Sequence, residues 1–280
     1  TSHEFKPSSS QFPKLVSGYC VKSHRPARFA ALFLALFSLA GLTHAGEVST
    51  LARPNIVFIL CDDLGYGDVH CLNPERCKIT TPNLDKLAAE GMTFTDAHST
   101  SAVCTPSRYG ILTGRYNWRS REQNGVLGGY SKPLIDANRL TVAGLLKQNG
   151  YTTAALGKWH LGMNISETPH VTKITGGPTT RGFNYFFGIA ASLDMPPFAF
   201  IENNHFTEAP TAVKTFKRQG AAAPHFEAED VVPKLVQKAE EFVTQTKGPF
   251  FLYLALPSPH TPLVPTKEWQ GKSVLGEYGD

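Results

Sequence analysis

The sequence has little net charge for its length and lacks any long basic run. Its 27 Lys and Arg residues against 23 Asp and Glu residues give a formal net charge of +4 over 280 residues. A nucleic-acid-binding protein normally carries a basic patch or a recognisable RNA-binding signature, and neither is present. Internal repeats and low-complexity blocks are also lacking. The mild positive charge remains compatible with a small anionic substrate.

The sequence also lacks an early methionine, since the first is Met92. Residues 1–20 are polar and patternless, which favours an upstream or non-native leader followed by a non-Met start such as Val21. In 21–45, basic residues precede an apolar run and a small residue closes it, as in a secretory signal peptide. We therefore expect the remaining domain, 46–280, to be secreted or periplasmic.

The apolar run of this signal peptide, 29–42, is too short to span a membrane comfortably. We therefore expect no stable membrane anchor, although a retained anchor remains an open alternative.

Cysteine is scarce, with five in the whole sequence. Cys20 lies in the predicted leader, and Cys61 closes an apolar segment that suits the core. Export permits disulfides, so Cys71 and Cys77 could pair. Cys104 is then left over, which in an exported protein flags a reactive residue, although a buried inert cysteine is the commoner outcome.

Cys104 opens the segment around which the chain is organised. Pro106 suits the first turn of a helix, so Cys104 should lie at or just before a helix N-terminus. Unpaired backbone N–H groups and the positive end of the helix dipole favour an anion there. Arg108, one turn further on, adds a fixed cation. A reactive group beside a cation suggests chemistry on an anionic ester.

Hydrophobic patterning predicts an α/β fold with a mainly parallel sheet flanked by helices. Apolar runs predict strands, buried on both faces, over 55–61, 151–156 and 250–256, and a short strand over 92–97. Helices are predicted over 81–91, 140–148 and 229–246, the first capped by Thr81. The remaining stretches are predicted to be core at 183–188, loops at 115–135 and 162–180, and an irregular excursion at 194–223.

Polar residues follow three of these predicted strands. Asp62 and Asp63 follow the first, and their adjacency suggests a bound cation, although a solvated turn is an alternative. Lys158 and His160 follow the second and, two apart on an extended backbone, should point the same way. His260 follows the third. Ligands gather at the carboxyl ends of parallel strands, so these groups should converge with Cys104.

Two motifs at appropriate spacing carry a family resemblance. The first is Cys104-Thr105-Pro106-Ser107-Arg108 followed by Ile111-Leu112-Thr113-Gly114, and the second runs from Gly150-Tyr151 to Gly157-Lys158-Trp159-His160. From about Pro54 to its end, the chain resembles the type I formylglycine-dependent sulfatases, which are arylsulfatase-like members of the alkaline phosphatase superfamily. The resemblance implies their α/β fold and the hydrolysis of sulfate monoesters, either aryl sulfates or sulfated carbohydrates.

The resemblance also implies a cofactor, a modification and a partner. A separate sulfatase-maturation enzyme would convert Cys104 to Cα-formylglycine, whose hydrate is the nucleophile. A Ca²⁺ ion would be held by Asp62, Asp63 and residue 104. Arg108 would hold the hydrate, and Lys158 would contact both formylglycine and the sulfate.

The resemblance gives three further residues a role. His260 would bind the substrate and protonate the leaving alcohol or phenol. His160 would remove a proton from the second hydroxyl so that sulfate is expelled. Ser192 would lie near the metal and substrate.

Relatives in this family carry a later Asp-Asn pair, a further Lys and a smaller C-terminal domain, none of which occurs before Asp280. We therefore expect an incomplete catalytic domain, truncated at the C-terminus, that binds calcium weakly and need not be active by itself. Two alternatives stay open: a phosphonate or phosphate ester hydrolase of the same superfamily, and a non-catalytic binding protein with unmodified Cys104.

Overall fold

A computed structural model describes residues 53–165 and 173–280. The predicted leader, 1–20, and signal peptide, 21–45, lie outside these residues, as does the start of the predicted mature domain. Among the helices that the structure describes, none is long and apolar enough to cross a membrane.

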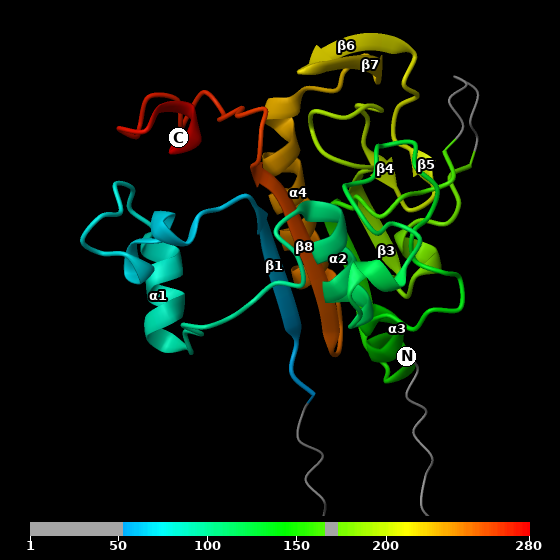
Figure 1. Ribbon diagram of the computed structural model, residues 1–280, viewed down its shortest axis with the longest axis horizontal. Helices are drawn as coiled ribbons and strands as arrows, with labels where there is room; N and C mark the ends of the chain where they lie inside the picture. The colour runs from blue at the N-terminus through cyan, green and yellow to red at the C-terminus, as the bar shows by residue number, and fades with distance from the viewer. Residues whose placement is uncertain (1–52, 166–172) are drawn as a thin grey trace, which may run out of the picture. The chain divides into compact units, whose positions relative to one another are not determined.

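A six-stranded sheet carries the fold, with the strand order β1-β8-β2-β3-β4-β5. β1, β8, β2 and β3 pair in parallel, and β4 and β5 add antiparallel hydrogen bonding beyond β3. This arrangement confirms the predicted, mainly parallel α/β sheet. Figure 1 shows β1 and β8 side by side at its centre. The strands are β1 (Ile56–Asp62), β2 (Thr152–Lys158), β3 (Tyr185–Ile189), β4 (Ile201–Glu202), β5 (His205–Phe206) and β8 (Phe250–Pro259).

Helices cover both faces of this sheet, with α4 behind β8 and α2 on the opposite side (Figure 1). Alternate residues of β8 divide between the two cores: Tyr253 joins the cluster that contains Leu112 of α2, while Leu252 joins the cluster that contains Leu235 of α4. The α-helices are α1 (Pro82–Glu90), α2 (Cys104–Thr113), α3 (Val142–Gln148) and α4 (Val231–Gln245). Short 3₁₀ helices occupy Tyr66–Asp68, His70–Leu72, Asn117–Arg119, Pro178–Thr180, Ala228–Asp230 and Gly276–Tyr278.

Each long helix that was predicted is present. Thr81 precedes α1 but does not cap it with its side chain; its hydroxyl instead donates to Asp85. α3 begins two residues later than predicted, where Thr141 accepts a hydrogen bond from the Gly144 N–H. The helical periodicity was therefore a better guide than the individual capping residues.

Two predictions about local structure were wrong. The segment 92–97 forms no strand, and Met92 and Phe94 in it are exposed. The stretch 194–223 is more regular than expected, because it contains β4, β5 and the hairpin β6 (Ala212–Phe216) and β7 (Arg218–Ala222).

The disulfide that export would permit between Cys71 and Cys77 is not formed, since both are free thiols.

β1 is not buried on both faces as predicted. It lies at the edge of the sheet, where β8 is its partner, and Val57 and Ile59 are 49% and 56% exposed. A hydrophobic run indicates a strand but does not report how many neighbours cover that strand, so burial could not be read from the run alone.

β2 approaches β8 very closely at Gly157. A Cβ atom placed on this residue would lie 2.0 Å from the Ala255 carbonyl oxygen, and its φ is +110°. Glycine is therefore required here for both steric and conformational reasons. The contact brings the end of β2, which carries Lys158, against the end of β8.

We predict that Gly157→Ala destabilises the chain by about 3 kcal/mol or more, because the added methyl group adds a backbone clash to an unfavourable φ. Gly248→Ala is the matched control, since Gly248 has a φ of +84° and open space where a Cβ atom would lie. The control should lose only about 1 kcal/mol. Urea unfolding of both variants measures the difference, and equal losses would contradict the close-approach argument.

Candidate active site

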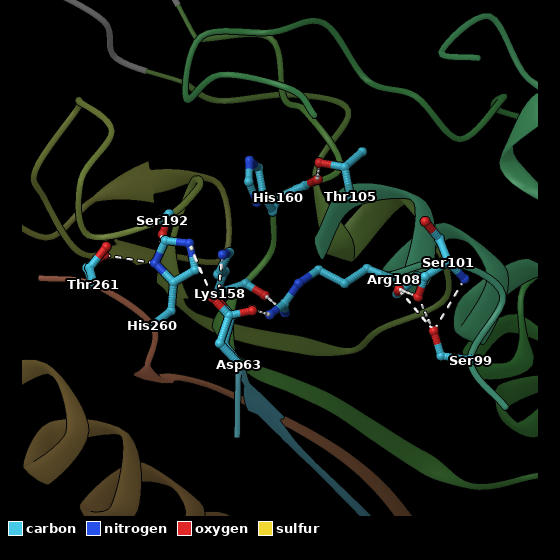
Figure 2. A network of polar contacts seen from close by, with 12 residues as sticks. Asp63, Ser99, Ser101, Thr105, Arg108, Lys158, His160, Ser192, His260 and Thr261 are labelled. Atoms are coloured by element: carbon cyan, nitrogen blue, oxygen red, sulfur yellow. Dashed lines mark hydrogen bonds and ion pairs between the residues drawn. The ribbon is translucent and has the colours of Figure 1, made fainter. Parts of the chain in front are cut away.

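The carboxyl ends of three neighbouring strands bring the predicted polar residues together (Figure 2). β8 lies between β1 and β2, so Asp62 at the end of β1 and Asp63 just after it meet Lys158 at the end of β2 and His260 after β8. The N-terminus of α2 contributes the segment from Cys104 to Arg108. The convergence predicted from the strand ends is therefore present in the fold.

A buried ion cluster of Asp62, Lys158 and Arg108 lies at the centre of the site. The Lys158 ammonium group donates to Asp62 Oδ2, and Arg108 Nη2 lies 3.5 Å from Asp62 Oδ1. Arg108 Nη1 also donates to the Lys158 carbonyl oxygen at 2.7 Å. All three residues are at most 5% exposed. Two cations against one carboxylate leave an excess positive charge, which suits an anionic ligand.

Cys104 is the first residue of α2, as the position of Pro106 predicted. Val103, the preceding residue, has an extended backbone and offers no side-chain hydrogen bond to the helix start. The first N–H groups of α2 are therefore free of a side-chain cap, which leaves the dipole end open to an anion. The Cys104 side chain is a free, partly exposed thiol.

Serine hydroxyls hold the segment that leads into α2. Ser107 Oγ donates to the Ser101 carbonyl oxygen at 2.8 Å and lies 3.2 Å from Ser99 Oγ (Figure 2). These contacts link the first turn of the helix to the preceding loop, so they help to keep Cys104 in place.

His160 is almost fully buried and does not follow an extended backbone, so the expected parallel alignment with Lys158 was wrong. β2 ends at Lys158, and His160 has a φ of +55°. Its Nε2 lies 2.5 Å from the Leu127 carbonyl oxygen, whereas Lys158 points to Asp62. Figure 2 shows the His160 ring apart from the Lys158 ammonium group.

The burial of His160 keeps its ring neutral. Loss of solvation, followed by the nearby Lys158 charge, lowers its pKa from 6.5 to about 3. His160 Nδ1 is buried and has no hydrogen-bond partner among the described residues. Because a carbonyl oxygen can only accept, Nε2 must carry the proton, and the neutral ring then leaves a bare lone pair on Nδ1.

His260 and Ser192 meet on the other side of the site. Ser192 Oγ lies 3.1 Å from His260 Nδ1, which also contacts the Thr261 carbonyl oxygen at 2.7 Å. His260 Nε2 lies 3.9 Å from Asp63 Oδ2. Ser192 follows β3, so a fourth strand end contributes to the site. His260 is partly exposed, which allows it to meet a substrate.

Asp62 and Asp63 fit part of a calcium site. Carboxylate oxygens are the ligands that Ca²⁺ prefers, and it takes about six to eight of them. Within the described ranges, no group of three or more His, Cys, Asp or Glu residues could hold a metal ion. Asp63 is 65% exposed at its side chain and has a φ of +68°. The two carboxylates therefore supply the right donor type but only some of the donors.

Sequence reasoning missed three residues that support the site. Thr105 lies next to Cys104 and its hydroxyl contacts both His160 and Leu127. Tyr253, treated only as part of a strand, has a buried hydroxyl without a hydrogen-bond partner in the described chain, and burial raises its pKa. A polar residue within an apolar run was the available signal for Tyr253, and position next to Cys104 was the signal for Thr105, whereas nothing in the sequence singled out Leu127.

A cavity of about 850 Å³ lies beside His260. Its walls come from the start of α4 and from the segment that follows β8, and they include one exposed aromatic residue, Trp269. Acidic side chains predominate among its charged lining residues, which are Glu229, Asp230, Lys267, Glu268, Glu277 and Asp280. A volume of this size can hold a small molecule.

Comparisons with known proteins agree on one family. The sulfatase family profile matches residues 54–279. The N-acetylgalactosamine-6-O-sulfatase of Bacteroides thetaiotaomicron is 36% identical over 270 residues, covering 81% of this chain and 52% of that protein. Human arylsulfatase G is 33% identical over 285 residues, covering 88% of this chain and 51% of the relative.

A solved structure extends the agreement to the fold. A chain determined in work on the metabolism of multiple glycosaminoglycans by Bacteroides thetaiotaomicron superposes with a TM-score of 0.73 at 33% identity, covering 81% of this chain and 55% of the other. This match confirms the sulfatase-like form of the α/β fold. The chain spans about half the length of the curated relatives it matches. With a family profile that covers most of its length and relatives that share its sequence and fold, the chain belongs to the sulfatase family.

Proposed function

We propose that this protein hydrolyses sulfate monoesters. The observation that carries the proposal is the buried cluster of Lys158, Arg108 and Asp62, whose excess positive charge lies beside the uncapped helix start that holds Cys104. An anionic ester group bound there would meet two fixed cations and free backbone N–H groups. The sulfatase names of the relatives support the same reaction.

The proposal includes a modification and a metal ion. Cys104 would be converted to Cα-formylglycine by a sulfatase-maturation enzyme, and its hydrate supplies the nucleophilic oxygen when present. Asp62, Asp63 and residue 104 would hold Ca²⁺, which supplies positive charge beside the sulfate oxygens. The C-x-P-x-R sequence from Cys104 to Arg108 and the two adjacent carboxylates support both parts.

The chain's own residues divide the remaining work. Arg108 holds the modified side chain of residue 104, and Lys158 contacts both that side chain and the sulfate group. His260, which is partly exposed and borders the cavity, donates a proton to the leaving oxygen. His160 is neutral and accepts a proton when sulfate is released. Ser192 helps to orient the His260 ring through its 3.1 Å contact.

A sulfated carbohydrate is the substrate class that the observations favour over a simple aryl sulfate. The cavity beside His260 has room for a sugar ring, and Trp269 provides an aromatic wall. One relative is named an N-acetylgalactosamine-6-O-sulfatase, which places a sulfated sugar among the substrates of similar proteins. Secretion or export to the periplasm, proposed from the signal-like segment 21–45, would expose the protein to such glycans.

Conversion of Cys104 is the first prediction of this proposal. After co-expression with a sulfatase-maturation enzyme, mass spectrometry of the peptide that contains residue 104 should show replacement of the thiol by an aldehyde. The converted protein should hydrolyse p-nitrophenyl sulfate faster than p-nitrophenyl phosphate. Cys104→Ala should neither form the aldehyde nor hydrolyse the sulfate ester. An unmodified thiol would favour a binding protein, and a preference for phosphate would favour a phosphoester hydrolase.

Removing Lys158 should affect stability and activity separately. Lys158→Met takes one cation from a buried carboxylate and should cost about 3–5 kcal/mol, because the remaining Arg108 contact is longer. It should also lower the rate by about 100-fold or more through loss of sulfate binding. Asp62→Asn is the comparison variant, because it leaves both Lys158 and Arg108 buried without a counter-ion and should therefore lose more stability than Lys158→Met in denaturant unfolding. An unchanged rate in Lys158→Met, measured on folded protein, would place the cluster outside catalysis.

Burial of neutral His160 predicts a pH dependence of stability. Its folded-state pKa of about 3 lies below the ordinary 6.5, so the unfolded chain binds more protons between these values. Its contribution to stability is therefore present above pH 6.5 and is lost as the pH falls towards 3, by up to about 1.4 kcal/mol per pH unit. The difference in unfolding free energy between wild type and His160→Gln should shrink over this window, and a constant difference would refute the assignment.

A further inference from the structure

Thr105, the second residue of α2, is fully buried and connects two segments that are distant in sequence. Its hydroxyl donates to the His160 carbonyl oxygen at 3.0 Å, and it accepts a hydrogen bond from the Leu127 N–H at 3.2 Å. The hydroxyl thus donates one hydrogen bond to the segment of His160 and accepts one from the segment of Leu127. Figure 2 shows Thr105 against the backbone of His160.

A third hydrogen bond, made by the ring of His160, completes this arrangement. Its Nε2 contacts the Leu127 carbonyl oxygen at 2.5 Å, so the two backbone groups of Leu127 are bound by Thr105 and His160 respectively. The contacts form a closed circuit from Thr105 to the His160 backbone, along that residue to its ring, and back through Leu127. Each of the three residues is at most 6% exposed, so water does not readily replace any of these bonds.

Leu127 is held by backbone hydrogen bonds rather than by a helix or strand. It lies in a stretch, 121–141, that contains neither helix nor strand. Its side chain packs into the core cluster on the α2 side of the sheet, but side-chain packing does not determine where a backbone carbonyl points. The Leu127 N–H donates to Thr105, and the Gly128 N–H, which shares a peptide plane with the Leu127 carbonyl group, donates to Ser131 Oγ at 2.9 Å. Of these two bonds, the one to Thr105 ties the Leu127 backbone to α2.

The circuit determines which ring nitrogen of His160 is available. The Leu127 carbonyl oxygen holds a proton on Nε2, and Nδ1 remains buried without a hydrogen-bond partner in the described chain. A ring that could flip or exchange tautomers would instead place a proton on Nδ1 part of the time. The bond made by one nitrogen thereby sets the role of the other.

We propose that Thr105 is a positioning residue for the proposed hydrolysis: by binding Leu127 and His160 together, its hydroxyl keeps Nε2 protonated and presents bare Nδ1 as the proton acceptor. The inference rests on the proposed function for its catalytic meaning. On sulfate release, a hydroxyl on modified residue 104 would give its proton to Nδ1 while its oxygen forms a C=O bond, and the C–O bond to sulfate would break with its electron pair leaving on sulfate. Nε2 would keep its own proton. The ring becomes an imidazolium, and it returns the new proton to water afterwards.

Thr105 can be altered without changing C-x-P-x-R, because it occupies the unspecified second position of that motif. Thr105→Val keeps the shape of the side chain and removes the hydroxyl, whereas Thr105→Ser keeps the hydroxyl. Thr141→Val is the matched control elsewhere in the fold. Thr141 is also buried, and its hydroxyl likewise accepts from a backbone N–H, that of Gly144, and donates to a carbonyl oxygen, that of Arg181.

The test is ¹⁵N NMR of the full chain with labelled histidine rings at neutral pH, with His160 assigned by His160→Gln. Protonated and bare ring nitrogens have well-separated ¹⁵N shifts, so the spectrum reports the tautomer directly. We expect protonated Nε2 and bare Nδ1 in the wild type, in Thr105→Ser and in Thr141→Val, and a mixture of tautomers in Thr105→Val. An unchanged tautomer in Thr105→Val would overturn the proposal.

Kinetics separate this inference from the proposed function. With rates normalised to formylglycine content, Thr105→Val should lower kcat on the order of 10-fold at nearly constant KM, and Thr105→Ser should restore it. If the converted wild type hydrolyses no sulfate ester, the proposed function fails while the spectra still decide the positioning role. If Thr105→Val does not fold, the wild-type spectrum decides, since a proton on Nδ1 would overturn the proposal.

Discussion

The rest of the site depends on the need to balance one buried carboxylate. Asp62 is 5% exposed at the end of β1, and a charge in such a position is tolerated only when it is paired and hydrogen-bonded. Lys158 reaches it from β2 and Arg108 from α2, so one interaction ties together two strands and a helix that are separated in sequence. The same interaction sets the local excess of positive charge on which the proposed anion binding relies.

The cluster also explains why the neighbouring imidazole of His160 stays neutral. The positive charge of Lys158 adds to burial in lowering the pKa of His160, so a neutral ring persists beside two cations. His260, at the partly exposed side of the site, has a different environment of a hydroxyl, a carbonyl oxygen and a distant carboxylate. The two imidazoles therefore have different surroundings, as the proposed division into a proton acceptor and a proton donor requires.

Local patterns predicted the elements well where a single face or a single run was decisive. The helix that begins at Cys104, the amphipathic α4 and the core of the parallel sheet all followed from short-range signals. Errors occurred where the outcome depends on distant partners: the exposure of β1 depends on which strands flank it, and the hairpin of β6 and β7 depends on pairing that has no strong alternation in sequence. The free thiols of Cys71 and Cys77 likewise could not be inferred from spacing.

By itself, the sequence determined that acidic, basic and imidazole groups would collect with Cys104 at the carboxyl ends of parallel strands, because strand direction and motif position are local properties. Only the tertiary structure decided how those groups pair. It turned His160 away from Lys158 through a left-handed backbone and gave its Nε2 to the Leu127 carbonyl oxygen. It also placed the Thr105 hydroxyl between His160 and Leu127. Hydrogen-bond partners between distant segments are set by packing in three dimensions, and no short stretch of sequence contains them.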